Sequence, residues 1–316
     1  MAEYSDNNPE NEDLSKSLFC AQFNVWYPVF AKLTIPSLII KLSKEFIEYI
    51  AGKSSQDSDE DISYGDEIIE PSFPSLEVEI AKCVKLLGGS VFPKLNWSAP
   101  CDAAWIKIGN SLKCKKFDEI YDLLKSSDTI STFDLSENII LSVAENAELF
   151  DHYLVLREWR EIDTSLEFRC FVKNSNLIAI SQRNHSDYYA FLSDIEMEVL
   201  ELISKFFATE VKKKILLPNC VFDCYVQSDI MSVILVDFSP FNELTDALLF
   251  TWEELNGPWE GVKIRKKEVQ GIYPNAKHLA GKVPKDFMDM ATGEDPQKLL
   301  DLLNLSKEDF QNLKKL

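Results

Sequence analysis

Two aspartates on neighbouring apolar segments are the residues of this chain best suited to metal chemistry. Asp223 lies inside one apolar run, and Asp237 ends a second run fourteen residues later. Two such runs separated by a short polar stretch predict an antiparallel hairpin. If the hairpin centres near Asp229, residue 223 pairs with residue 235, and Asp237 becomes its diagonal neighbour at about 7–8 Å between Cα atoms. Two carboxylates at that separation can converge on a cation.

Mg²⁺ is the cation that suits this pair of carboxylates. It prefers oxygen ligands, keeps several waters and shares its coordination shell with substrate phosphates, so it needs few protein groups. The same two residues also fit a purely structural arrangement, in which one buried acid pairs with an arginine and the other caps the end of a strand. The hairpin alone leaves both arrangements open.

Three basic residues on other apolar segments could supply the opposite charge. Lys94 lies in one predicted strand, Arg169 alternates with apolar residues in another, and Arg183 ends a third. Arginine binds phosphate oxygens through two hydrogen bonds, and lysine acts as a point charge. Together with Mg²⁺, these residues outline a site for a polyphosphate. Ion pairs within the sheets, including pairs with Glu167, are the alternative.

The hydrophobic pattern predicts an α+β protein with antiparallel sheets. The sequence contains no Walker lysine motif, kinase glycine-rich loop or dinucleotide fingerprint, so we expect a nucleotide to lie between sheets. Apolar spacing predicts helices at 76–87, 117–124 and 195–207 and strands at 91–95, 153–159, 166–172, 177–182, 219–226 and 232–238. The segment 102–108 is expected to lead into a further strand.

The charge of the chain argues against several classes of partner. The 316 residues include 33 Lys and Arg against 52 Asp and Glu, for a net charge of −19. A field of that sign opposes non-specific binding to nucleic acids and anionic lipids. No apolar run is long enough for a membrane span, and the acidic N-terminus argues against a signal peptide. Seven scattered cysteines fit a reducing compartment, so we expect a cytoplasmic monomer.

Several segments resemble the eukaryotic cell division cycle protein 123 family. They are Phe92–Pro100, Glu167–Val172, Ile180–Arg183 and Asp237–Leu255, and the resemblance extends over roughly residues 18–303. It implies an ATP-grasp fold, in which two lobes with antiparallel sheets close on Mg²⁺ and ATP. It also implies an assembly chaperone that binds the gamma subunit of eukaryotic translation initiation factor two, so that the alpha and beta subunits can join.

Composition and resemblance together predict the domain organisation. Residues 1–15 are expected to be disordered, and residues 16–152 to form an N-terminal lobe with an acidic loop at 54–70. Residues 153–290 would form the C-terminal ATP-grasp lobe, and residues 291–316 a helical tail.

The resemblance also assigns roles to individual residues around the nucleotide. Lys94 would reach the phosphates, which Arg169 and Arg183 would also face. A loop that includes Ser98, Ala99 and Asp102 would cover the phosphates. The segment Arg157-Glu158-Trp159 would be the hinge between the lobes, with its backbone groups bonded to the adenine.

The metal positions fall on Asp223, Asp237 and Ser239. Here the chain departs from the family pattern, because ATP-grasp proteins usually have asparagine two residues after the second acid. A serine hydroxyl is a shorter and weaker ligand, so we expect Ser239 to act through water or to leave one metal position weak.

Two functions of different classes follow from this site. In the first, ATP orders the two lobes and the closed form binds the partner. In the second, the chain is an ATP-grasp ligase that forms an acyl-phosphate, which requires an acceptor pocket that the sequence does not reveal. No catalytic residue is assigned. The −19 charge favours a basic partner surface, and Trp26, Tyr27 and Trp259 could contact it or belong to the core.

Overall fold

The computed structural model describes residues 9–52, 72–144 and 150–268, which all belong to one compact unit of the chain, Met1–Glu268. The second unit, Val269–Leu316, lies outside the described residues. The predicted acidic loop at 54–70, which belongs to the first unit, and the predicted helical tail at 291–316 also lie outside them. Among the residues described, no helix combines the length and apolar character needed to cross a bilayer.

A three-stranded antiparallel sheet carries Lys94 on one of its edge strands. Its strands are β1 (Ser37–Lys41), β2 (Val91–Lys94) and β3 (Tyr153–Glu158), in the order β1-β3-β2. The central strand is apolar and buried at Leu154, Val155 and Leu156. Because β3 pairs with both other strands, this sheet ends at Glu158 rather than at the predicted lobe boundary before Tyr153.

Four helices of the described residues accompany this sheet, and the first three contribute to its core. They are α3 (Lys44–Ile50), α4 (Pro74–Leu86), α5 (Phe117–Lys125) and α6 (Glu137–Val143). Helix α4 ends before Gly88 and Gly89, whose φ angles of 85° and 89° favour glycine. The segment 102–108 was expected to lead into a further strand. Cys101–Ile106 forms a 3-10 helix, and the chain then reaches only an isolated antiparallel bridge between Cys114 and Val91.

A five-stranded sheet carries the two aspartates and Arg169 of the predicted site, and Arg183 directly follows its strand β5. Its order is β7-β6-β4-β5-β8. The strands are β4 (Glu167–Lys173), β5 (Asn176–Gln182), β6 (Cys220–Val226), β7 (Val233–Ser239) and β8 (Lys263–Arg265). Strand β8 pairs in parallel with β5, so this sheet is mixed and not purely antiparallel as predicted. The α+β class is confirmed.

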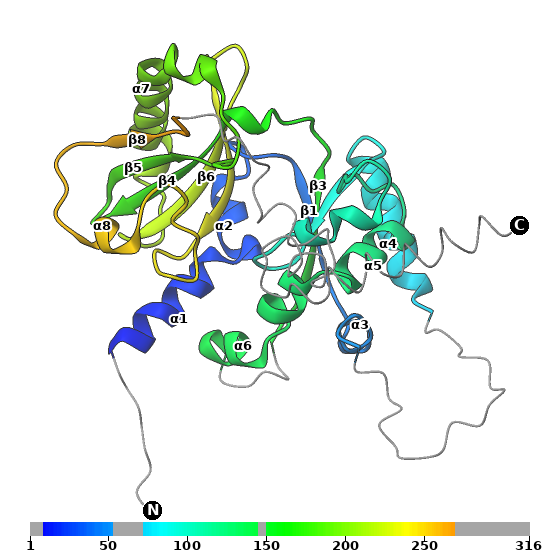
Figure 1. The fold of residues 1–316 in the computed structure, drawn as a ribbon. Coiled ribbons are helices and arrows are strands. Elements are labelled where there is room, and N and C mark those ends of the chain that lie inside the picture. The colour runs from blue at the N-terminus through cyan, green and yellow to red at the C-terminus, as the bar shows by residue number, and fades with distance from the viewer. Residues whose placement is uncertain (1–8, 53–71, 145–149, 269–316) are drawn as a thin grey trace, which may run out of the picture. The chain divides into compact units, whose positions relative to one another are not determined.

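The core of the five-stranded sheet includes aromatic residues from the start of the chain. Helix α2 (Phe23–Phe30) contributes Phe23, Trp26 and Phe30, which are at most 1% exposed. Helix α7 (Glu196–Phe206) contributes an apolar stripe to the same core and lies beside the strands in Figure 1. Helix α1 (Pro9–Ala21) corrects the prediction of disorder through residue 15.

The other described elements are short. They are the helix α8 (Trp252–Asn256), the 3-10 turns Thr164–Leu166 and Ala190–Ser193, and the π-helical turns Ile130–Asp134 and Phe207–Val211. The turn Ile130–Asp134 bears on function, because it ends at a buried carboxylate that contacts the predicted phosphate loop.

Candidate functional site

Asp223 and Asp237 lie directly opposite each other on β6 and β7. An irregularity after Asp223 shifts the register, so that Leu235 pairs with Cys224 and the predicted pairing of residues 223 and 235 is wrong. Side chains directly opposite in an antiparallel pair have Cβ atoms about 4.5–5.5 Å apart. The Cβ atoms of the two aspartates are therefore closer than those of a diagonal pair would be. Two carboxylates this close repel each other unless cations lie nearby.

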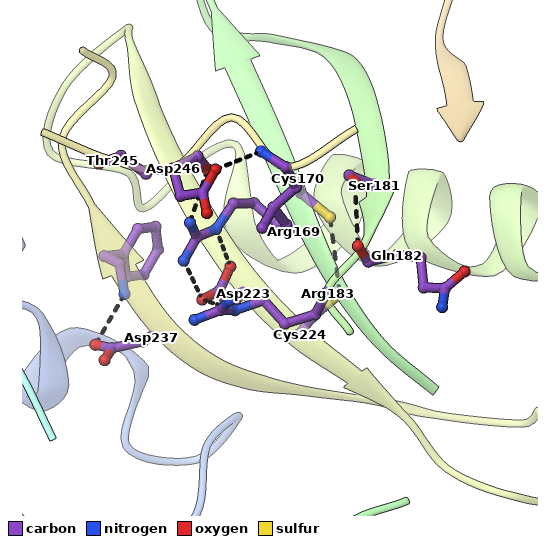
Figure 2. A network of polar contacts seen from close by, with 12 residues as sticks. Arg169, Cys170, Ser181, Gln182, Arg183, Asp223, Cys224, Asp237, Thr245 and Asp246 are labelled. Carbon is purple, nitrogen blue, oxygen red and sulfur yellow. Dashed lines mark hydrogen bonds and ion pairs between the residues drawn. The ribbon is translucent and has the colours of Figure 1, made fainter. Parts of the chain in front are cut away.

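Arg169 supplies one of these cations through a bidentate ion pair with Asp223. Its Nε and Nη2 atoms donate to the two carboxylate oxygens at 2.8 Å each, and Nη1 donates to the Asp246 carbonyl at 2.8 Å. Figure 2 shows these contacts, with Arg183 approaching the same carboxylate. Arg169 is only 5% exposed. Its guanidinium thus holds Asp223 in the structural ion pair that the sequence left open, and its predicted role toward phosphates stays a prediction.

Arg183 is the more accessible of the two arginines. Its Nε donates to Asp223 at 3.2 Å, and 42% of its side chain is exposed. Burial opposes ionisation of Asp223, but the Arg169 and Arg183 guanidiniums outweigh it and hold the pKa of Asp223 below its usual value. Asp223 is therefore an ionised carboxylate, and Arg183 can turn toward a ligand at little cost.

Lys94 joins the two sheets through an ion pair with Asp237. The lysine is 1% exposed and comes from β2, whereas Asp237 comes from β7 and 22% of its side chain is exposed. The Lys94 ammonium also lies 5.2 Å from the centre of the Phe23 ring. A lysine this deeply buried requires an anion, and in this structure the anion is one of the two predicted metal ligands.

Asp134 fixes the predicted phosphate loop by accepting hydrogen bonds from its backbone. The sequence analysis assigned no role to this residue. The Trp97 and Ser98 amides donate to its carboxylate at 3.0 and 3.1 Å, and the Trp97 indole donates to the Leu18 carbonyl at 2.8 Å. Asp134 is 0% exposed. Burial raises the pKa of Asp134 to about 6, although the two amides act in the opposite direction. The loop is thus fixed by hydrogen bonds and contains no glycine.

A hollow of about 410 Å³ lies beside this loop and brings several predicted residues together. Ser98, Arg169 and Ser239 line it, together with Thr245 and Asp246. Ala99 and Asp102 are not among the described residues that line it. The hollow therefore connects the phosphate loop of one sheet with the end of β7 in the other.

Asp102 has a structural task that differs from its predicted contact with the cofactor. Its carboxylate accepts hydrogen bonds from the Ser127 hydroxyl at 2.6 Å and from the Thr129 amide at 3.0 Å. Both oxygens are therefore engaged in connecting the loop to the turn that carries Asp134.

The backbone donors of the predicted hinge are already used within the three-stranded sheet. The Glu158 amide donates to Pro36 at 2.8 Å and the Trp159 amide to Ser90 at 3.1 Å. The Arg157 side chain is buried and donates to the Thr34 hydroxyl at 3.1 Å. These two amides therefore have partners within the protein, and the predicted contact of the hinge backbone with adenine stays a prediction.

The residues that follow the predicted hinge line a hollow. Arg160, Glu161 and Ile162 line a second hollow of about 350 Å³ beside Tyr225 and Gln227.

Glu167 is a second residue of the site that was assigned no ligand role. It lies on β4 two residues before Arg169, so both side chains point to the same face of the sheet. Burial raises the pKa of Glu167 to about 7, and Asp223 acts in the same direction, while Arg183 and Arg157 oppose it. Its apolar surroundings in the sequence gave no sign of this perturbation.

The oxygen atoms of the Asp223 and Asp237 side chains fit a metal whose remaining ligands are phosphate oxygens and water. Among the described residues, no group of three or more His, Cys, Asp or Glu side chains is arranged to hold a metal ion. Asp223 and Asp237 provide two adjacent carboxylates, and Ser239 lies two residues beyond Asp237 on the same face. Such a site suits Mg²⁺ only if water and phosphate oxygens complete its coordination.

Comparison with known proteins places this chain in a family. The D123 family model matches residues 51–291. A protein of Xenopus tropicalis named "Translation initiation factor eIF2 assembly protein" is 36% identical and aligns with 91% of this chain and 96% of its own length. A protein of the same name from Schizosaccharomyces pombe is also 36% identical, over 91% of this chain and 96% of its own.

A solved structure agrees with these sequence matches. The C-terminally truncated Cdc123 of Schizosaccharomyces pombe is 34% identical, with a TM-score of 0.67 over 80% of this chain and 98% of that one. The family model, the relatives and the fold thus agree, and the chain belongs to the D123 family.

Proposed function

We propose that this chain binds ATP with Mg²⁺ between its two sheets and promotes assembly of translation initiation factor eIF2 in the cytoplasm. The observation that supports the nucleotide site is the Lys94–Asp237 ion pair, because it brings together across the two sheets a buried cation that suits phosphate and a carboxylate that suits a metal. Asp223 and the half-exposed Arg183 extend the same cluster. An ATP-grasp arrangement accounts for all four residues.

Binding would exchange partners within this cluster rather than build it anew. Lys94 would leave Asp237 for a phosphate oxygen, and Asp237 would become available to the metal beside Asp223. Arg183 would turn from Asp223 toward the phosphates, while Arg169 would keep Asp223 in place. Mg²⁺ would supply the charge that neutralises the phosphates. Each buried charge would thus keep a partner in both states, which avoids the cost of an unpaired buried ion.

The partner assignment rests on the relatives and on the family resemblance. Relatives that cover 91% of this chain are named as eIF2 assembly proteins. The gamma subunit is the partner that the resemblance implies, with the alpha and beta subunits joining afterwards. ATP would influence this interaction only through a preference for one arrangement of the two sheets.

Titration calorimetry with and without Mg²⁺ tests the nucleotide site. Wild type should bind ATP in Mg²⁺ and lose most of that affinity in EDTA, and Asp237→Ala should show no metal-dependent binding. Glu243→Ala is a matched control, because Glu243 is an exposed acid four residues after Ser239. Metal-dependent affinity that survives in Asp237→Ala, with an unchanged circular dichroism spectrum, would contradict the assignment.

A further inference from the structure

A short segment after the phosphate loop exposes two large apolar side chains. Trp105 is 55% exposed and Ile108 is 105% exposed, the highest value among the exposed large hydrophobic residues of the described chain. The other five tryptophans are buried or half-buried. Single exposed apolar residues are common on protein surfaces. Trp105 lies in the 3-10 helix Cys101–Ile106, and Ile108 lies in the turn that directly follows this helix. We call these two exposed residues, three positions apart, the apolar knob.

The knob is held in a fixed conformation. The Asn110 amide donates to the Lys107 carbonyl at 3.0 Å, which closes a turn with Ile108 at its second position. Gly109 follows with a φ of 85°, the value that a type II turn requires at that place. The Lys107 ammonium donates to the Glu119 carboxylate of α5 at 3.0 Å, which attaches the first residue of the turn to that helix. Ile108 is therefore exposed by a well-defined turn.

The residues between and after the two knob residues include four lysines, of which Lys107 and Lys116 are paired with Glu119 and Asp118. The segment 105–116 contains Lys107, Lys113, Lys115 and Lys116 and no acid, which makes it a local basic segment in a chain of net charge −19. Lys115 and Lys116 are exposed, although Lys116 also lies 3.5 Å from Asp118. A partner surface that contacts this segment would be attracted by its lysines if it carries acidic groups. A surface that contacts most other parts of the chain would be attracted if it carries basic groups.

We propose that Trp105 and Ile108, with Lys115 and Lys116 at their edge, form a docking surface for an acidic, apolar patch on a protein partner. This inference rests on the proposed function and takes the gamma subunit of eIF2 as that partner. A rigid aromatic anchor with a charged rim is typical of residues that dominate binding energy. Because the turn is fixed before binding, little conformational freedom is lost on association.

The surface also replaces the docking residues that the sequence suggested. Trp26 is 1% exposed in the core, and the Tyr27 hydroxyl is bonded to Ser37. Trp259 is half-buried and packs against Phe250. None of these three offers a partner as much apolar area as the knob.

A double variant tests the surface directly. Trp105→Ser with Ile108→Ser should weaken binding of the purified gamma subunit, measured by biolayer interferometry, by at least tenfold. Leu86→Ser with Met231→Ser is the matched control, because these residues are 77% and 76% exposed elsewhere on the chain. The control should bind like wild type. Affinity for ATP and the circular dichroism spectrum should be unchanged in both double variants.

Charge reversal provides an independent arm of the experiment. Lys115→Glu with Lys116→Glu should slow association and reduce its dependence on salt, since both effects arise from charge complementarity. Single-stranded RNA is measured in parallel by fluorescence anisotropy, because basic segments with aromatics also occur in RNA-binding proteins. RNA binding that the Trp105/Ile108 variant loses would overturn the assignment to a protein partner.

The outcomes separate this inference from the proposed function. If wild type and the Trp105/Ile108 variant bind the gamma subunit equally, the docking surface is wrong and the proposed function stands. If wild type binds none of the gamma, alpha and beta subunits, the proposed function fails and the docking surface fails with it.

Discussion

Lys94 and Asp237 form an ion pair that connects an edge strand of the three-stranded sheet to an edge strand of the five-stranded sheet. The pair places a buried ammonium beside one of two adjacent carboxylates. A polyphosphate with a divalent cation is complementary to both members, since the ammonium suits phosphate oxygens and the carboxylates suit the metal. The predictions below follow from this arrangement.

Removing the Lys94 ammonium should weaken the binding of triphosphates more than that of monophosphates. Lys94→Ala should cost about 2–3 kcal/mol of ATP binding, in line with hydrogen bonds to charged groups. The affinity for AMP should change much less. Titration calorimetry with both nucleotides measures the preference, and an unchanged ratio of ATP to AMP affinity would contradict the role given to Lys94.

Substitutions of the two arginines beside Asp223 should have different effects, one mainly on the free energy of unfolding and the other mainly on ATP binding. Arg169→Leu leaves a buried carboxylate without its bidentate partner, so it should lower the free energy of unfolding by about 3–5 kcal/mol. Arg183→Leu removes a half-exposed guanidinium and should cost less than about 1 kcal/mol, yet weaken ATP binding. Urea unfolding and calorimetry on both variants measure the two effects. Equal losses of stability would show that the two arginines have the same role.

Ser239 offers a gain-of-affinity experiment. Asparagine provides a longer side chain with a carbonyl oxygen. Ser239→Asn should therefore raise the affinity for Mg²⁺ in the presence of ATP or leave that affinity unchanged. Ser239→Ala should leave it unchanged if the hydroxyl acts only through water. Mg²⁺ titrations at fixed ATP measure both. A large loss in the asparagine variant would mean that Ser239 lines the site in another role.

Asp134 should give a pH-dependent contribution to stability. Burial raises its pKa from 3.8 to about 6, so the folded state binds a proton more readily than the unfolded state does. Wild type should therefore lose stability relative to Asp134→Asn as the pH rises from 4 to 7, by up to about 3 kcal/mol. Urea unfolding at several pH values measures the difference. A difference that is constant with pH would contradict the buried, ionising carboxylate.

The local elements could be predicted because apolar periodicity determines them. The strands that carry Arg169, Asp223 and Asp237 are found where alternating apolar residues predict them. The register of the hairpin was predicted wrongly because an irregularity after Asp223 shifts the pairing of β6 with β7. No single residue type in the sequence indicates such a shift. The direct facing of the two aspartates follows from that irregularity.

The remaining parts of the site depend on contacts between distant segments. Asp134 reaches Ser98 across 36 residues, and Lys94 reaches Asp237 across 143. A lone acid in a helical turn gives no sequence signal for such a contact. The family resemblance assigned Arg157 to a hinge between the lobes, and the pairing of β3 with β1 and β2 places it inside the strand that apolar spacing predicts at 153–159.

The rate of eIF2 assembly with a site variant tests the central claim most directly. Purified gamma subunit is incubated with this protein, ATP and Mg²⁺, and joining of the alpha subunit is followed by fluorescence. Wild type should accelerate joining, Asp237→Ala should not, and Glu243→Ala should match wild type. If Asp237→Ala accelerates joining at the wild-type rate while failing to bind ATP, nucleotide binding is not coupled to assembly and the account is wrong.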